Sequence, residues 1–300
     1  VGTLAIAGYW FKPTQYALLA GLLQTMGMSG AIFGQAPLRQ MVESIGWRDT
    51  INLLALVALV LAILLFKLVP MRSSEQKQRA PNVSVLQGLK AVTTNLQTWI
   101  CSLIGFGMAA TMLAFGGLWG VPWLNSVHGY TTTEAAGITS MIFVGWAIFS
   151  PLAGWASDRM GRRNLILRTG SLIALLATAC LIYFTPQSTL LLMALIFVIG
   201  AGGSAMTVCF GSVKELNDIN YSSTSLGLMN MCIVGAGAVM QPLIGWLLDS
   251  NWDGTMQAGA RIYSSSDYST AFFSLLVANL AALIGALLLR ETYCEQISAE

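Results

Sequence analysis

The sequence predicts an all-α polytopic membrane protein. Of its 300 residues, 55% are hydrophobic and only 9% are charged, whereas about 25% of the residues of a soluble domain carry a charge. So few charges do not cover a water-facing surface of this size, and the mean hydropathy is +0.68. Apolar runs of about 20 residues, the length of a membrane-spanning helix, recur along the chain. The apolar side chains are therefore expected to face lipid as well as a protein core.

Eight of these runs are long enough to be full transmembrane helices, and one is partial. The partial span, residues 1–9, opens the chain on Val1 without a signal peptide, and we interpret it as the tail of a truncated helix. The longest polar stretch, residues 71–97, lies between the second and third full spans. The full spans are expected at residues 16–42, 47–69, 98–124, 133–156, 164–184, 189–213, 222–248 and 269–290.

The basic residues predict the orientation, because Lys and Arg gather on the cytoplasmic side of a membrane protein. Numbering the loops alternately places 12 of the 15 Lys and Arg residues on one side, and only Arg39, Arg48 and Arg261 on the other. One missed span would scramble this alternation. The side with twelve includes residues 71–97 and the C-terminus, which we therefore expect to be cytoplasmic.

The span at 16–42 resembles the span at 222–248 at an offset of 206 residues. Residues 20–24 (AGLLQ) align with residues 226–230 (LGLMN), and Gln35 then falls on Gln241. A proline follows each glutamine closely. Chance likeness of Gly- and Leu-rich membrane helices is the alternative, but the shared Gln and Pro favour an internal repeat, a feature of many secondary transporters.

A distinctive motif lies between the fourth and fifth full spans. It reads Gly154-Trp-Ala-Ser-Asp158-Arg159-Met-Gly161-Arg162-Arg163. A plain basic loop would explain the arginines but not an aspartate between two glycines. An aspartate at a helix C-terminus is disfavoured by the helix dipole, so Asp158 is expected to need a cation or the N-terminus of another helix as its partner.

The pattern G-x-x-x-D-R-x-G-R-R resembles the signature loop of the major facilitator superfamily, where it follows the second helix of a six-helix half. Here it follows the second span after residues 71–97. The resemblance implies that residues 1–70 are the end of helix 4 with helices 5 and 6, that 71–97 is the cytoplasmic loop between bundles, and that 98–300 is the C-terminal six-helix bundle with a short tail. The first helices would then be absent, and a bacterial inner (plasma) membrane is the expected location.

In such transporters two bundles rock around a site at the membrane midplane, and the resemblance implies that the signature loop is a conformational latch. Asp158 would engage the start of helix 11, near Ser222–Ser225, while the cytoplasmic side is closed. The latch residues are Gly154, Asp158, Arg159, Gly161, Arg162 and Arg163.

Polar and aromatic residues that face the bundle interior are candidates for a substrate pocket. Trp119 and Trp123 belong to a Gly-rich span with Pro122, which indicates a kinked gate helix. Interfacial packing of the aromatic residues, and hydrogen bonding between helices by the amides, are the alternatives. The candidates are Gln24, Gln35, Trp119, Trp123, Asn230 and Gln241.

Ionisable residues within the membrane usually carry proton coupling, but all 13 acidic residues lie at span ends or in loops. Glu215 comes closest to the interior and is the candidate coupling residue, with a local pair to Lys214 as the alternative interpretation. Either the coupling groups lie in helices outside this chain, or the protein is a facilitator.

The expected function is secondary active or facilitative transport of a small polar solute, such as an amino acid or related nutrient, by alternating access. Drug or metabolite efflux by proton antiport is an alternative, weakened because the region Gly27–Pro37 contains no Gly-Pro pair. A non-transporting membrane sensor is another, although the loop and tail are too small for a signalling domain.

An enzyme is not expected, because the spans show neither clustered catalytic residues nor a P-loop. The five cysteines form no metal-binding pattern, and we expect no disulfide, metal site or other cofactor. The expected partners are the solute, the lipid bilayer and a coupling proton or cation, without nucleic acid, and the expected state is a monomer.

Overall fold

The computed structural model describes residues 2–3, 11, 15–34, 36–68, 84–184, 186–257 and 260–296. Within these residues the chain is almost wholly helical, with one antiparallel hairpin of two short strands. In chain order the elements are α2 (Tyr16–Gly34), α3 (Ala36–Ile45), α4 (Trp47–Leu68), α6 (Val85–Thr94), α7 (Leu96–Thr111), η2 (Met112–Trp119), α8 (Gly120–His128), α9 (Thr132–Met160), α10 (Arg163–Phe184), α11 (Thr189–Gly203), η3 (Ser204–Met206), α12 (Thr207–Glu215), η4 (Ile219–Tyr221), α13 (Ser222–Asn251), β1 (Met256–Gln257), β2 (Ala260–Arg261) and α14 (Ser265–Leu288).

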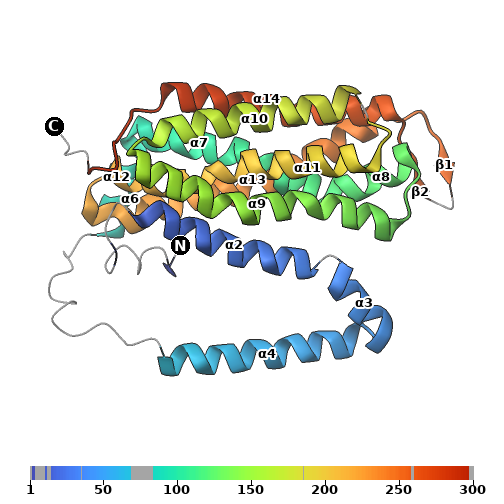
Figure 1. The fold of residues 1–300 in the computed structure, drawn as a ribbon, viewed down its shortest axis with the longest axis horizontal. Helices are drawn as coiled ribbons and strands as arrows, with labels where there is room; N and C mark the ends of the chain where they lie inside the picture. The colour runs from blue at the N-terminus through green and yellow to red at the C-terminus, as the bar shows by residue number, and fades with distance from the viewer. Residues whose placement is uncertain are drawn as a thin grey trace.

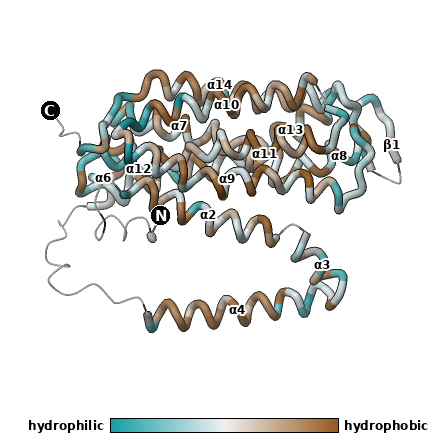
Figure 2. The backbone as a smooth tube through the Cα atoms, in the orientation of Figure 1, coloured by the Kyte–Doolittle hydropathy of each residue, from teal (hydrophilic) through white to brown (hydrophobic). Residues whose placement is uncertain are grey.

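Eight helical segments of the described chain are long and apolar enough to cross a membrane, which confirms the eight predicted full spans. Figure 2 shows hydrophobic residues along the middle of the bundle and hydrophilic residues gathered at its two ends. The predicted partial span lies mostly outside the described residues. The eight segments are α2, α4, α7–η2–α8, α9, α10, α11–η3–α12, η4–α13 and α14.

The first span is shorter than predicted. The prediction of one helix over 16–42 is wrong, since α2 ends at Gly34 and a separate helix, α3, begins at Ala36. Pro37 lies in the first turn of α3, where a proline is tolerated because its missing N–H would have no partner in the helix. The proline that follows the glutamine in the other half of the repeat, Pro242, lies instead inside the continuous helix α13.

Six spans form one bundle, with α7 near its centre. Helix α7 packs against α13 and α14, and α11 packs against both α9 and α10. Helix α2 lies along α9, while α3 and α4 turn away below it (Figure 1). Almost every described side chain of α4 is exposed, apart from Thr50. The apolar surface of α4 therefore requires lipid or other helices to cover it.

The span formed by α7, η2 and α8 is irregular where a kink was predicted. The irregular part is the π-helix η2, and Pro122 follows it in the first turn of α8. A Cβ atom on Gly116 would lie 2.7 Å from the side chain of Ile142 on α9. The wide turn and its glycines thus bring this span close to α9. Such π-helical turns are frequent at functional sites.

The two ends of the bundle differ. The end where residues 154–163 lie, here called the basic end, also holds the ends of α12 and α14 (Figure 1). Lys214 lies in the last turn of α12, and Arg290 follows α14. The opposite end, the hairpin end, carries β1 and β2 (Figure 1). The polar stretch 71–97 is described from residue 84 and is not all loop, because it includes helix α6, which packs against α13.

Candidate functional site: a charge cluster at the basic end

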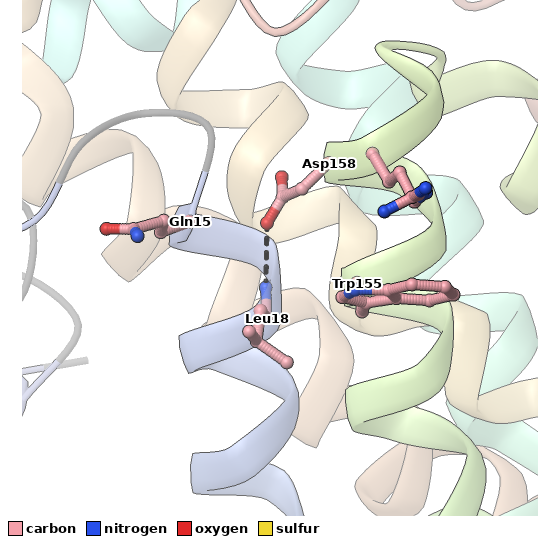
Figure 3. A pocket seen from close by; sticks show the side chains of 5 residues that line it. Gln15, Leu18, Trp155 and Asp158 are labelled. Atoms are coloured by element: carbon pink, nitrogen blue, oxygen red, sulfur yellow. Dashed lines mark hydrogen bonds between the residues drawn. The ribbon is translucent and has the colours of Figure 1, made fainter.

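The signature loop is a tight turn between α9 and α10. Helix α9 ends at Met160 and is followed by Gly161, which has φ +63°, a left-handed conformation that glycine adopts without strain. Helix α10 begins two residues after Gly161, at Arg163. This geometry leaves Asp158 in the last turn of α9, as predicted, with its carboxylate turned toward α2 (Figure 3).

Asp158 joins the end of α9 to the start of α2. Its Oδ2 accepts a hydrogen bond from the backbone N–H of Leu18 at 3.0 Å, one of the N–H groups that the first turn of a helix leaves without an internal partner. Its Oδ1 lies 2.5 Å from Nη1 of Arg163, and only 5% of its side chain is exposed. The carboxylate therefore meets both kinds of partner that its position demands, a cation and a helix N-terminus.

The helix that Asp158 engages differs from the one expected. The resemblance places the contact at Ser222–Ser225, the start of α13, but the structure places it at the start of α2. The physical reason is that α9 packs lengthwise against α2, so that the last turn of one meets the first turn of the other. Ser225 instead donates a hydrogen bond to the carbonyl of Ser222 within α13.

Arg163 is the centre of the cluster and is fully buried. Its Nη2 and Nε donate to the two carboxylate oxygens of Glu215 at 2.6 and 3.2 Å, a bidentate arrangement that strengthens the pair. Its Nη1 donates to Asp158 and also to the hydroxyl of Ser157 at 3.1 Å. One arginine thus bridges two carboxylates from two different spans.

The expected pair between Lys214 and Glu215 is not formed. Glu215 is 5% exposed and pairs with Arg163, while the ammonium of Lys214 lies 4.4 Å from the ring centroid of Tyr16 on α2. Neighbouring residues on a helix point in different directions, which separates the two side chains. Lys214 therefore supplies a second contact between α2 and the bundle at the basic end.

The chain after α14 closes the cluster. The carboxylate of Glu291 accepts hydrogen bonds from the backbone N–H groups of Arg163 and Asn164 at 2.8 and 3.0 Å, capping α10. Thr292 donates to Oε2 of Glu215 at 2.5 Å. Sequence reasoning missed both residues, and the signal that could have found them is an acidic residue with a hydroxyl directly after the last span.

Cys294 belongs to the same segment. Its side chain is buried and its sulfur lies 3.9 Å from the carbonyl oxygen of Ser157. Burial raises the pKa of its thiol to about 11, although the nearby Arg163 acts in the opposite direction. The segment 289–296 is thus packed into the basic end and does not trail from it.

Small residues bring α2 and α9 into close contact. A Cβ atom on Gly154 would collide with the carbonyl group of Ala17, and one on Gly21 would lie 2.5 Å from the carbonyl oxygen of Ser150. Further along, the hydroxyl of Thr25 donates to the carbonyl of Ala147 at 2.6 Å. These contacts follow one face of α2, because residues three to four apart share a helix face.

Trp155, Asp158 and Arg159 of the loop line a small cavity. It has a volume of about 250 Å³ and lies between the start of α2 and the end of α9 (Figure 3). The guanidinium of Arg159 lies 5.5 Å from the ring centroid of Trp155, and the side chain of Arg162 is exposed. Neither arginine forms an ion pair with a described residue. The residues that line the cavity are Gln15, Leu18, Trp155, Asp158 and Arg159.

The predicted pocket residues do not form one group. Trp119 and Gln241 do come together: the indole N–H of Trp119 donates to the carbonyl of Gln241 at 3.0 Å, and the amide of Gln241 donates to the carbonyl of Leu113 at 2.8 Å. These bonds tie the π-helical segment η2 to α13. Both residues therefore link helices in this structure.

The other pocket candidates lie apart from that pair. Trp123 is 3% exposed and packs edge-on against Phe115, Phe272 and His128 in an aromatic cluster. Gln24 and Asn230 are half-buried, and Gln35 lies outside the described residues. In the part of the chain that the structure describes, no group of three or more His, Cys, Asp or Glu residues could hold a metal ion.

Comparison with known proteins agrees with this architecture. The sequence profile of the Major Facilitator Superfamily matches residues 1–213 and, in an overlapping match, residues 115–293. The solved structure of FucP, a transporter of that superfamily in the outward conformation, aligns with a TM-score of 0.65 at 14% identity. The alignment covers 92% of this chain and 69% of FucP, and at this identity it shows the fold alone.

Curated relatives are more similar in sequence. The probable nitrate/nitrite transporter NarK2 of Mycobacterium tuberculosis is 26% identical over 67% of this chain and 50% of its own length. The gentisate transporter of Corynebacterium glutamicum is 26% identical over 74% of this chain and 51% of its own length. The MFS-type transporter pynF of Aspergillus niger is 24% identical over 83% and 56%. The chain thus spans about half the length of the curated relatives that it matches, and it belongs to the major facilitator superfamily.

Proposed function

We propose that this chain forms part of a transporter that moves a small polar solute across the membrane by alternating access, with the loop Gly154–Arg163 as a latch that holds the basic end closed. The observation that carries the proposal is the hydrogen bond from the Leu18 N–H to the Asp158 carboxylate. It joins α2, which we assign to one bundle, to α9 of the other. In a rocking mechanism such a bond exists only while that end is closed.

The distribution of contacts along α2 supports a state closed at the basic end. The contacts of α2 with α9 involve Leu18, Gly21 and Thr25, in the half of α2 nearest the basic end. Toward the hairpin end the packing is looser, since a Cβ atom on Gly30 would meet nothing within 4 Å, although Met28, Ala31 and Ile32 still pack against the core. If the basic end is cytoplasmic, as the basic residues predict, this arrangement corresponds to an outward-facing state.

The solute class is proposed from chemistry and from relatives. The described spans carry Lys and Arg only near their ends, so a solute bound at the midplane would meet amides, hydroxyls and indole N–H groups of this part of the chain. The names of two relatives specify nitrate, nitrite and gentisate, which are small anions. Small anions therefore join amino acids as the first solutes to test.

The role proposed for Glu215 follows from its contacts. It is held by Arg163 and by Thr292 at the end of its span, which suits a partner within the latch better than a proton carrier in the solute path. The contacts of Glu215 therefore give no reason to assign proton coupling to it. Drug efflux by antiport and a non-transporting sensor are the competing functions.

Uptake by the complete protein in proteoliposomes tests the proposal. Nitrate, gentisate and an amino-acid mixture are offered with and without a proton gradient, to the wild type, to Asp158→Asn and to Asp253→Asn. The last variant is the control, because the hydrogen bonds of Asp253 to described residues stay within a turn at the hairpin end.

We expect uptake of at least one solute and a loss of about tenfold or more in Asp158→Asn, with the control unchanged, since a hydrogen bond to a charged group contributes about 1.5–3 kcal/mol. Uptake that Asp158→Asn leaves unchanged would contradict the latch and leave the transporter standing. Binding of a solute without its movement, across the whole panel, would favour the sensor.

A further inference from the structure

Helix α3 joins two membrane-spanning helices at the hairpin end. One residue separates the end of α2 from the start of α3, and Gly46 alone separates α3 from α4. Both neighbours are long and apolar enough to cross a membrane, whereas α3 has 10 residues, about 15 Å of helix, which is too short. Figure 1 shows α3 running across the ends of α2 and α4 and not along them. The two short connections therefore keep α3 within one residue of both spans.

The lengths of the spans place α3 at the edge of the hydrocarbon. Helix α2 has 19 residues, about 28 Å of helix, which is close to the roughly 30 Å thickness of the hydrocarbon core. The chain has thus crossed the core when α2 ends. It enters again at Trp47, whose side chain is 56% exposed beneath the guanidinium of Arg48 at 4.5 Å. Tryptophan gathers at the level of the lipid headgroups, so α3 lies at that level.

The sequence of α3 is amphipathic. At 3.6 residues per turn its large apolar residues fall within about 100° of the helix circumference, and they are Leu38, Met41, Val42 and Ile45. The opposite arc carries Gln40, Glu43 and Ser44. One short helix thus presents an apolar face and a polar face, which is the pattern of a helix that lies in a membrane interface.

The described chain covers only part of the apolar face. Helix α3 contacts α2, α4 and α9, and Leu38 and Met41 are half-buried. Val42 is 38% exposed and Ile45 is 46% exposed. Because these side chains lie at the edge of the hydrocarbon, the apolar surface next to them is that of the lipid.

A defined turn fixes the direction of α3 against α4. Gly46 has φ +82°, a conformation that glycine adopts without strain at the end of a helix. Its N–H donates to the carbonyl of Val42 at 3.0 Å, and its carbonyl accepts from the hydroxyl of Thr50 at 2.8 Å. Thr50 is 1% exposed. The change from the membrane plane to the membrane normal is thus built into hydrogen bonds.

From this geometry we infer that α3 is an interfacial helix, which lies in the plane of the membrane at the hairpin end with its apolar face between headgroups and acyl chains. The partner is the lipid of that leaflet. Helix α3 contains one basic and one acidic residue and has no net charge, so apolar burial holds it and zwitterionic lipid is sufficient. This inference does not depend on the proposed transport.

Spin labels on the complete protein, in vesicles of phosphatidylcholine, test the inference. Single cysteines replace Val42 and Ile45 on the apolar face, and Gln40 and Ser44 on the polar face, in a background without native cysteines. Collisions with oxygen, which concentrates in lipid, are compared with collisions with a water-soluble nickel chelate. The references are Leu56, exposed midway along α4, and Thr255, exposed in the hairpin.

We expect the labels at Val42 and Ile45 to collide mainly with oxygen, at a depth of about 5–10 Å, between the two references. The labels at Gln40 and Ser44 should collide mainly with the nickel chelate. Adding phosphatidylglycerol to the vesicles should leave all four depths unchanged, because α3 has no net charge. With the label at Val42, Ile45→Asn should shift the depth toward that of Thr255, and the matched control Gln40→Asn should not.

Three outcomes would overturn the inference. Nickel-dominated collisions at all four positions would place α3 in water above the membrane. Oxygen-dominated collisions at all four would make α3 a continuation of a span. Few collisions with either reagent at Val42 and Ile45 would show that protein, such as a second copy or helices outside this chain, covers the face. If the cysteine-free background does not fold, a lipid-soluble diazirine that labels the wild type, with the labelled residues read by mass spectrometry, gives the same comparison.

Discussion

Replacing Gly21 by alanine is expected to separate α2 from α9 at the basic end. The new Cβ atom would lie 2.5 Å from the carbonyl oxygen of Ser150 and 2.6 Å from the Cα atom of Pro151. A carbon atom normally comes no closer to a carbonyl oxygen than about 3.3 Å, so the helices must move apart by about 0.8 Å. Both colliding partners are backbone atoms, which no side-chain rotation can remove.

That displacement is enough to break the contact proposed as the latch. The distance from the Leu18 nitrogen to Asp158 would grow from 3.0 Å to about 3.8 Å, beyond the range of a hydrogen bond. A hydrogen bond to a charged group contributes about 1.5–3 kcal/mol. At 1.4 kcal/mol for each factor of ten, the equilibrium between closed and open states should shift by about 10- to 150-fold toward the open basic end.

Pulsed electron–electron double resonance, which measures the distance between two spin labels, detects this shift. Spin labels at Gln15 and Met160, both exposed, report the distance between the start of α2 and the end of α9 in a background without native cysteines. Gly27→Ala is the matched control, because it makes the same change on the same helix where a Cβ atom would meet nothing within 4 Å. Thermal unfolding shows whether both variants stay folded. A folded Gly21→Ala whose distance distribution coincides with that of Gly27→Ala would refute the reasoning.

Three further predictions concern the charge cluster. Arg163→Gln should lower the free energy of unfolding by about 3–5 kcal/mol, because it leaves two buried carboxylates without their cation; unfolding in SDS measures this, and Arg163→Gln/Glu215→Gln should recover part of the loss. Glu291→Gln should cost about 1 kcal/mol through the cap of α10, seen as a lower melting temperature; an unchanged value would argue against the cap. In a variant whose one cysteine is Cys294, with a thiol pKa raised to about 11, about one thiol in a thousand is ionised at pH 8. Maleimide labelling should therefore be slow, should quicken as the pH rises toward 11, and should quicken at pH 8 when Glu291→Gln loosens the tail.

The fold was largely predictable from the sequence, because membrane spans depend on local composition. Apolar runs of a fixed length mark each helix wherever it packs, and all eight full spans are found. The helix predicted over residues 16–42 was too long, because hydropathy alone does not show where one helix ends and the next begins. Pro37 was the available signal, since it favours the first turn of a new helix.

The site was predictable only in part, because its contacts join distant segments. Asp158 was recognised as a residue that needs a cation or a helix N-terminus, from its place at the end of a span, and it has both partners. Which helix supplies the N–H depends on how α9 packs. No local pattern contains that information. The family resemblance led us to expect the contact at the start of α13, whereas the start of α2, its counterpart in the repeat, supplies it. Glu291 and Thr292 were missed because their partners lie more than 70 residues away along the chain.

Arg163 makes the proposed latch reversible. When the basic end opens, Asp158 loses the Leu18 N–H but keeps the guanidinium of Arg163, which belongs to the same loop. At the Asp158 carboxylate, opening therefore costs about one hydrogen bond to a charged group and does not leave a buried carboxylate unpaired, a penalty that would exceed 3 kcal/mol. Because Glu215 and the backbone cap from Glu291 hold Arg163 from behind, the cation stays in place in either state. A bound solute can reverse a free-energy difference of a few kcal/mol between the closed and open states. A transporter that alternates between two states requires their free energies to differ by no more than this.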